Sequence, residues 1–219
     1  MLLGLLSSLD TFVFFVVALV IAITIHEWAH AWVATLLGDP TARLSGRLTL
    51  NPVSHMDPLG TIMLFLAGFG WGRPVPYNPN FVKQGKLGEV IIALSGPASN
   101  IVVAFIFALP ARIMLLQTGT VPEGNLFRFL AIVVTLNVLL AAFNLIPIPP
   151  LDGSKILYLI LDKVSFGAVS WAAFERIGPL LLLALIFAER LFNINIIFRL
   201  LDPVIFLINW IIGASSPFF

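Results

Sequence analysis

The sequence predicts an all-α polytopic membrane protein. Two observations support this prediction: the amino-acid composition and a series of apolar segments. Of its 219 residues, 59% are hydrophobic and only 11% are charged. Soluble domains carry about 25% charged residues, so a chain this poor in charge is expected to lie in a lipid bilayer. About six apolar segments follow one another too closely to leave room for a soluble module. We therefore expect one integral-membrane domain over residues 1–219.

Composition also excludes several classes of site. The formal net charge is +1, so the chain offers no basic surface for nucleic acid. There is no cysteine, which removes disulfides and thiolate ligands. Any bound metal must therefore use histidine and carboxylate side chains.

The first apolar segment, residues 11–37, is long enough to cross a bilayer. We expect Asp10 to cap its N-terminus, and the sequence GDP at residues 38–40 to end it. The connection that follows suggests extended structure. Residues 41–50 alternate apolar and polar side chains, which favours a short strand.

Two further pieces precede the next long helix. Residues 59–70 are apolar but too few to span comfortably, so we expect a short or re-entrant helix. Residues 71–79 contain three prolines, which favour an extended loop or edge strand. A short β or extended region associated with the membrane is thus predicted between the first and third helices.

Helices follow over the rest of the chain. The segment at residues 86–116 contains GPASN at residues 96–100, where a mid-membrane proline beside small residues favours a kink and close packing. The next apolar segment, residues 125–146, runs into the sequence NLIPIPPLDG at residues 144–153. The remaining predicted helices are a short one at residues 154–163 and two apolar ones at residues 171–188 and 193–212.

The first apolar segment holds the sequence HEWAH at residues 26–30. Residues four apart share one face of a helix, so His26 and His30 can offer two imidazoles to one metal ion. Glu27 completes the H-E-x-x-H zinc pattern as candidate general base. A charged side chain at mid-membrane costs roughly 2.5–3.5 kcal/mol, so it usually has a function. The alternative is a polar cluster that only bonds neighbouring helices.

A catalytic zinc ion takes three protein ligands and keeps one open position. The candidates for the third ligand are Asp152, Glu89, His55 and Asp57. Glu89 could instead favour a helix N-terminus, and His55 could be an ordinary interfacial histidine. Asp152 follows a proline-rich break, which a membrane protein tolerates where the backbone is buried or lines a cavity. Its alternative role is to cap the helix at residues 154–163.

The basic residues indicate the topology. They gather between the first and third helices and after the fourth: Arg43, Arg47, Arg73, Lys83, Lys86, Lys155 and Lys163. Basic loops favour the cytoplasmic side. The histidine pair and Asp152 are then expected at similar depth, near the cytoplasmic face.

Three motifs together resemble the site-2 protease family of intramembrane zinc metalloproteases. They are HEWAH at residues 26–30, GPASN at residues 96–100, similar to the family's G-P-x-x-N, and NLIPIPPLDG at residues 144–153, similar to its N-x-x-P-x-P-x-x-D-G. The resemblance covers a catalytic core of about residues 20–155. The C-terminal helices, at about residues 165–213, carry no signature. The chain resembles the minimal form, without PDZ or nucleotide-sensing domains.

The resemblance implies one zinc ion per chain, bound by His26, His30 and Asp152, with Glu27 as general base. It also suggests that Asn144 donates a hydrogen bond to the oxyanion. An interhelical hydrogen bond is the alternative role for Asn144. We expect Asn100 to be structural, joining its helix to the motif helix.

The resemblance further implies hydrolysis of peptide bonds in single-pass transmembrane substrates, as in regulated intramembrane proteolysis. We expect the protein in a bacterial cell membrane, with its active site towards the cytoplasm. Residues 43–50 and 71–78 could capture an unwound substrate by strand addition. One rival function, a zinc-dependent membrane enzyme acting on a lipid or prenyl-peptide, leaves the second motif unexplained. The other, a non-enzymatic metal-binding membrane protein or transporter, should show an inverted repeat.

Overall fold

The computed structural model describes residues 8–67, 70–118, 122–162 and 168–192, together with residues 199, 202, 203 and 206. Its elements, in chain order, are α2 (Leu9–Leu36), α3 (Thr41–Leu44), the 3₁₀ helix η1 (Pro52–Ser54), α4 (Pro58–Ala67), α5 (Lys86–Thr118), α6 (Asn125–Asn144), α7 (Gly153–Asp162) and α8 (Ala168–Phe192).

Four described helices are long and apolar enough to cross a membrane: α2, α5, α6 and α8. They confirm a helical multi-pass membrane protein. The predicted segment at residues 59–70 forms α4, whose ten residues are too few to span. The predicted helix at residues 193–212 lies almost wholly outside the described residues.

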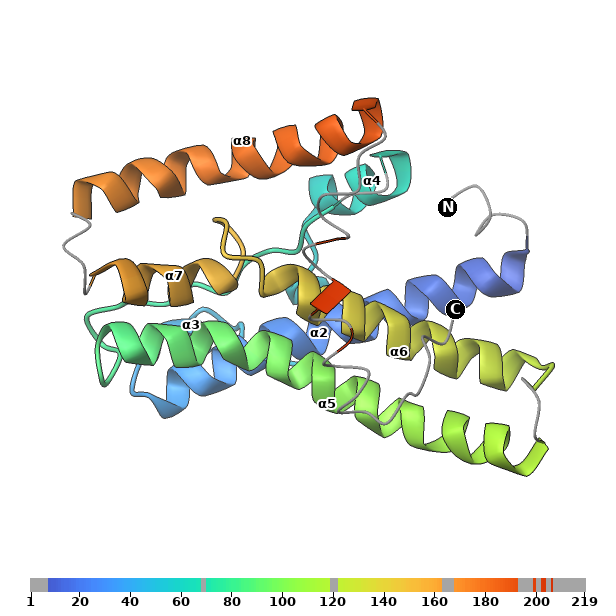
Figure 1. Cartoon of the computed structure of the whole chain (residues 1–219). Helices are drawn as coiled ribbons and strands as arrows, with labels where there is room; N and C mark the ends of the chain where they lie inside the picture. Colours follow the sequence, from blue (N-terminus) through green and yellow to red (C-terminus); the bar gives the residue numbers. More distant parts are fainter. Residues whose placement is uncertain are drawn as a thin grey trace.

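The centre of the fold is the three-helix unit of α2, α5 and α6 (Figure 1). Alanines line the contacts of this unit, and Ala18, Ala22, Ala104 and Ala141 are fully buried. Small side chains let helix backbones approach closely, which is the main source of helix association in lipid. The sequence thus places small residues inside and larger apolar ones, such as Val102 and Ile106, outside.

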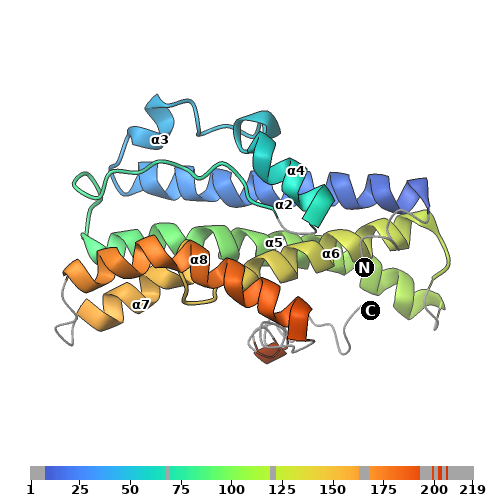
Figure 2. The ribbon, with the colours of Figure 1, turned by 90° about the horizontal axis from the view of Figure 1, so that it is seen from above.

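Shorter elements cover the two sides of this unit. Figure 2 shows α3 and α4 beyond α2 on one side, and α7 and α8 on the other side, against α5 and α6. The residues of the site described below come from α2, from α5 and from the connection between α6 and α7.

The predicted strand at residues 41–50 is wrong. Thr41–Leu44 form the short helix α3, and the described part of the chain contains no strand, only an isolated antiparallel bridge between Met56 and Gly72. The buried carboxylate of Asp39 explains the difference, because it accepts hydrogen bonds from the backbone N–H and the hydroxyl of Thr41. Such an Asx-type turn starts a local bend that alternation of side chains does not reveal.

The N-terminal cap of α2 also differs from the prediction. Ser8, not Asp10, caps the helix: its Oγ accepts from the backbone N–H of Thr11 at 3.3 Å. Asp10 lies in the first turn instead, where a carboxylate favours the positive end of the helix dipole.

Candidate metal centre

Two histidines of α2 and one aspartate from the α6–α7 connection come together. Asp152 Oδ2 lies 3.2 Å from His26 Nε2 and 3.4 Å from His30 Nε2. The three ligand atoms all lie within 4.8 Å of one another. Four tetrahedral bonds of 2.0–2.1 Å place ligand atoms about 3.3 Å apart. The spacing therefore fits a single zinc ion.

Hydrogen bonds fix which imidazole nitrogens face the aspartate. His26 Nδ1 lies 2.6 Å from Asn100 Oδ1, and His30 Nδ1 lies 2.7 Å from the carbonyl oxygen of Ile92. Carbonyl oxygens only accept, so each Nδ1 must carry the proton. Each Nε2 is left with a lone pair directed at the ion site, the usual arrangement of a metal-binding histidine.

Gly96 of α5 lets the histidines occupy this position. A Cβ atom at residue 96 would lie 2.4 Å from His30 Nε2 and 2.6 Å from His26 Cε1. No side chain fits there, so glycine is required for α5 to pass beside the imidazoles. The glycine of the GPASN motif thus has a direct steric reason.

The break between α6 and α7 presents Asp152. Gly153 permits the fold of this break, because a Cβ there would lie 2.2 Å from the carbonyl oxygen of Leu145. Asp152 Oδ2 is buried and has no hydrogen-bond partner among the described residues. A buried carboxylate oxygen without a partner is costly unless a cation satisfies it. The donor set of the site therefore fits a bound metal.

Glu27 is half-buried beside this group and faces the loop that covers α2. A Cβ on Gly72 would lie 3.6 Å from Glu27 Oε1. The buried guanidinium of Arg47 lies on the same side. Burial lowers the pKa of Arg47 and nearby Arg73 adds to this, while the charge of Glu27 opposes both. The carboxylate of Glu27 thus lies against Gly72, close enough to Arg47 for its charge to act on the guanidinium.

A set of hydrogen bonds holds this loop. His55 is fully buried and its Nε2 donates to the carbonyl oxygen of Thr49 at 2.7 Å. The carbonyl oxygen of His55 accepts from the N–H of Arg73 at 2.8 Å, and Arg47 donates to the carbonyl oxygen of Arg73. His55 is therefore a structural residue of the loop, apart from the metal-binding group.

The other two candidates for the third ligand are also engaged elsewhere. Glu89 accepts a hydrogen bond of 2.9 Å from the hydroxyl of Tyr77. Asp57 accepts one of 2.7 Å from the N–H of Gly60 at the start of α4. Among the described residues only Asp152 joins the two histidines.

One asparagine contacts a histidine of the site, and a second, which was not predicted from the sequence, contacts the first. Asn100 joins α5 to α2 as predicted, since its Nδ2 donates to the carbonyl oxygen of Ala22. The same Nδ2 donates to Asn137 Oδ1 at 2.9 Å, so Asn137 of α6 extends the network to a third helix. Asn137 could have been found from the sequence, because a polar amide side chain inside an apolar membrane span usually has a function. Asn144 Nδ2 donates to Leu140 within α6 at 3.0 Å, and its predicted catalytic role stays a prediction.

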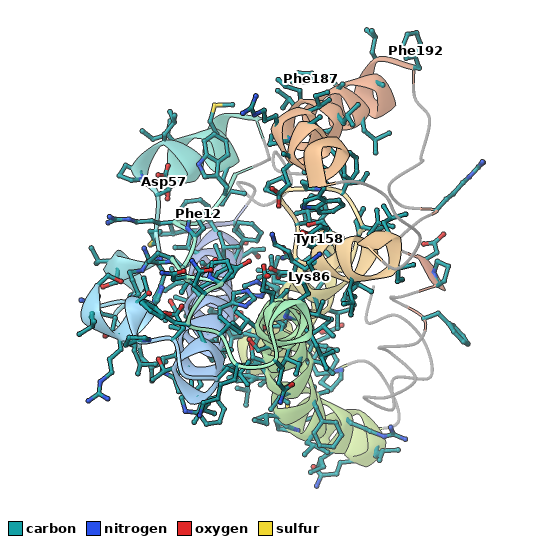
Figure 3. The ribbon with its side chains drawn as sticks, turned by 90° about the vertical axis from the view of Figure 1, so that its left-hand side faces the viewer. Phe12, Asp57, Lys86, Tyr158, Phe187 and Phe192 are labelled. Atoms are coloured by element: carbon teal, nitrogen blue, oxygen red, sulfur yellow. The ribbon has the colours of Figure 1, made fainter. Side chains whose placement is uncertain are left out.

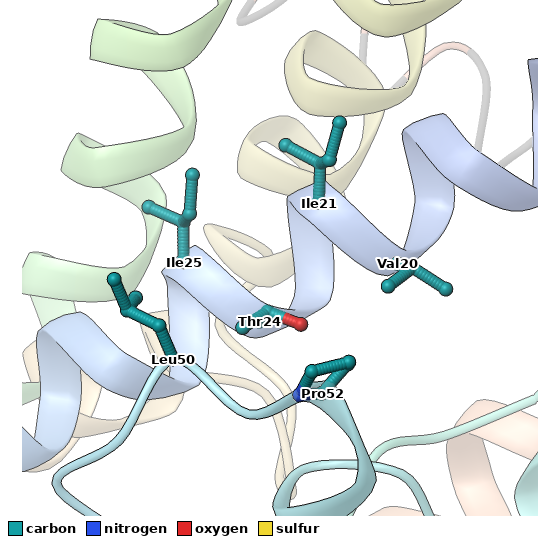
Figure 4. Close-up of a pocket in the computed structure, with 6 residues that line it drawn as sticks. All are labelled: Val20, Ile21, Thr24, Ile25, Leu50 and Pro52. Carbon is teal, nitrogen blue, oxygen red and sulfur yellow. The ribbon is translucent and has the colours of Figure 1, made fainter.

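A separate apolar groove does not belong to this centre. It has a volume of about 230 Å³ and lies between α2 and the loop before η1 (Figure 4). Its lining residues are Val20, Ile21, Thr24, Ile25, Leu50 and Pro52. None of the ligand candidates lines it.

Comparison with known proteins agrees with the geometry. The model of peptidase family M50 matches residues 14–117 and 110–188. YwhC of Bacillus subtilis, by its name a candidate zinc metalloprotease, is 44% identical over 147 residues, covering 66% of this chain and 67% of YwhC. Rip2 of Mycobacterium tuberculosis, similarly named, is 29% identical over 154 residues, 68% of this chain and 57% of Rip2.

A third relative matches most of the chain. Zinc metalloprotease MJ0392 of Methanocaldococcus jannaschii is 25% identical over 205 residues, 92% of this chain but 50% of MJ0392. The chain thus spans between half and two thirds of the length of these relatives. No solved structure matches it. The chain belongs to peptidase family M50, the site-2 protease family of zinc metalloproteases.

Proposed function

We propose that this protein hydrolyses peptide bonds inside the transmembrane segments of single-pass membrane proteins. One observation carries the proposal: His26 and His30 meet Asp152, and they lie on a helix that is able to span the membrane and that also carries Glu27. A protease with its acid–base group at this depth can act on a bond that lies in the bilayer.

Each residue of the site has a separate role in the proposed reaction. His26, His30 and Asp152 would hold the ion through Nε2, Nε2 and Oδ2. Zinc, when bound, supplies Lewis-acid activation of water and of the scissile carbonyl. Glu27 takes a proton from the attacking water and returns it to the leaving amine.

Asn144 is proposed to donate its Nδ2–H to the oxyanion. That amide is bonded to the carbonyl oxygen of Leu140 in the absence of substrate. The side chain must therefore rotate away from its own helix to take up this role.

Substrate must be unwound before it is cut, because the carbonyl groups of a helix are bonded internally. Of the two segments nominated for strand addition, residues 43–50 begin in helix α3. Residues 73–78 have no helical structure, and Gly72 beside them lies against Glu27. We therefore assign substrate capture to residues 71–78.

We place the active site towards the cytoplasm of a bacterial cell. The basic residues Arg43, Arg47 and Arg73 all lie in the connection between α2 and α5, and basic connections favour the cytoplasmic side.

The test is Glu27→Gln in the full chain, purified in detergent, with a single-pass protein as substrate. We expect zinc content equal to the wild type and cleavage reduced at least about 100-fold, because the proton acceptor is lost. Glu123→Gln, which alters an exposed carboxylate, serves as control. Undiminished cleavage by Glu27→Gln contradicts the proposal, and cleavage of a lipid instead of a protein favours the rival enzyme class.

A further inference from the structure

One face of α8 lies against the segment that carries Asp152. Trp171, Glu175, Gly178 and Leu182 follow one another at spacings of four, three and four residues, so they share one side of the helix. Each of them contacts or packs beside a residue between positions 146 and 158, as the next paragraphs describe. The opposite side of α8 is exposed, for example at Ala173 and Leu180.

Gly178 of α8 packs closely against Pro149, three residues before Asp152. A Cβ atom at residue 178 would lie 2.5 Å from the carbonyl oxygen of Pro149 and 2.6 Å from its Cβ. The backbone of α8 therefore rests directly on the proline break, three residues from the candidate ligand. Leu182 continues this contact in a buried cluster that also contains Ile146 and Leu151.

Two further contacts hold the chain after Asp152. Glu175 Oε1 lies 3.0 Å from Lys155 Nζ, and Trp171 stacks on Tyr158 with ring centroids 4.7 Å apart. Tyr158 also lies 4.6 Å from Lys86 Nζ of α5, and Figure 3 shows these two residues together between α5 and α8. The segment is thus held by α8 on both sides of the aspartate.

Asp152 needs such support because no hydrogen bond between described residues fixes the carboxylate oxygen that faces the histidines. It lies outside the helices α6 and α7, and its Oδ2 has no hydrogen-bond partner among the described residues. The two histidines, in contrast, are each held by a hydrogen bond at Nδ1. The geometry of the third ligand therefore depends on the packing around the break.

We propose that α8 positions the third metal ligand, with Gly178 as its principal positioning residue. The inference rests on the proposed zinc centre, and it gives α8, which carries no sequence motif, a defined role. A larger side chain at residue 178 pushes α8 away from Pro149 or displaces the break, and either movement carries Asp152 away from the imidazoles.

The experiment measures metal binding by the full chain in detergent micelles. We expect Gly178→Leu to weaken zinc affinity roughly 10–100-fold in chelator competition, the range seen when support of a ligand is lost. The absorption spectrum of the cobalt-loaded variant should also change, because the ligand geometry around the ion differs. Helix content should not fall, since leucine favours helix more than glycine does.

Ala173→Leu is the matched control, because it adds a leucine to the exposed side of the same helix. It should keep wild-type affinity and spectrum. If Gly178→Leu does not fold, Trp171→Ala decides the question on the same face: it removes the stacking on Tyr158 and should weaken zinc binding several-fold.

A folded Gly178→Leu or, in its absence, Trp171→Ala with wild-type affinity and spectrum overturns the inference. A wild-type chain that binds zinc but cleaves no protein overturns the proposed function alone. A wild-type chain that binds no zinc overturns both.

Discussion

His26 Nδ1 of α2 lies 2.6 Å from Asn100 Oδ1 of α5, although the two residues are separated by 74 positions in the chain. Asn100 of α5 thus orients the imidazole of His26, which belongs to α2. Asn100 is itself held by Asn137 of α6, so three membrane helices share one buried polar network.

Replacing Asn100 with alanine should therefore affect the metal site. We expect Asn100→Ala to weaken zinc affinity roughly 10–100-fold, because His26 loses the acceptor that fixes its tautomer. The buried partners left unsatisfied should also lower stability by about 1–3 kcal/mol. Chelator competition and thermal unfolding measure the two effects. Asn80→Ala, at an exposed asparagine, should change neither, and wild-type affinity in Asn100→Ala would contradict the role assigned to the contact.

Gly96→Ala tests the close approach of α5 to the histidines. The added methyl group would lie within 2.6 Å of both imidazoles, so we expect zinc affinity to fall at least about tenfold. Helix content should be retained, because alanine is the better helix former. Gly124→Ala is the control, since a Cβ there meets nothing within 4 Å. Full zinc binding by Gly96→Ala would show that the helices separate easily at this point.

Val75→Pro tests capture of the substrate by residues 71–78. Proline removes the backbone N–H that a paired strand would use, and a hydrogen bond is worth about 1 kcal/mol. Cleavage of a single-pass substrate should therefore fall roughly fivefold while zinc content stays constant. Val75→Ala keeps the N–H and should cleave at the wild-type rate. Equal rates for the two variants would exclude strand addition at this residue.

Asp39 should make the fold sensitive to acid. Burial raises the pKa of this carboxyl, but the hydrogen bonds from Thr41 and Asn78 outweigh that effect, so the pKa lies below its usual value. A lowered pKa contributes stability above the unfolded value of about 3.9, and this stability is lost as the pH falls through the folded value. The midpoint of thermal unfolding should therefore drop as the pH falls from about 5 towards 3.

Asp39→Asn should flatten this dependence and lower the stability at neutral pH by about 1–3 kcal/mol. Thermal unfolding in detergent across the same pH range provides the measurement. Glu123→Gln, at an exposed carboxylate, should behave as the wild type. If the midpoint of thermal unfolding of Asp39→Asn still drops steeply in acid, groups other than Asp39 cause the pH dependence.

The parts of the site that follow from helical periodicity or from spacing were predictable. His26 and His30 share a helix face in any α-helix, and the break before Asp152 follows from its prolines. Topology predicted a similar depth for these groups, the family resemblance implied that they share one ion, and the structure brings all three together.

Other parts depend on contacts between distant segments, which spacing does not encode. The alternation at residues 41–50 predicted a strand, but Asp39 starts a helix there by bonding Thr41. The role of Asn137 depends on its hydrogen bond from Asn100 of another helix, which the sequence of α6 does not reveal. The role of Gly96 likewise becomes visible only when the imidazoles lie against α5.

The separation of Asp152 from the histidine pair has a consequence for biosynthesis. When α2 enters the bilayer, it carries His26, His30 and Glu27 but lacks Asp152, the third member of the candidate metal-binding group, which follows only after α5 and α6. A nascent chain halted before that point holds no competent centre. Under the proposed function, the chain becomes able to cut other proteins only after its own insertion has advanced past α5 and α6.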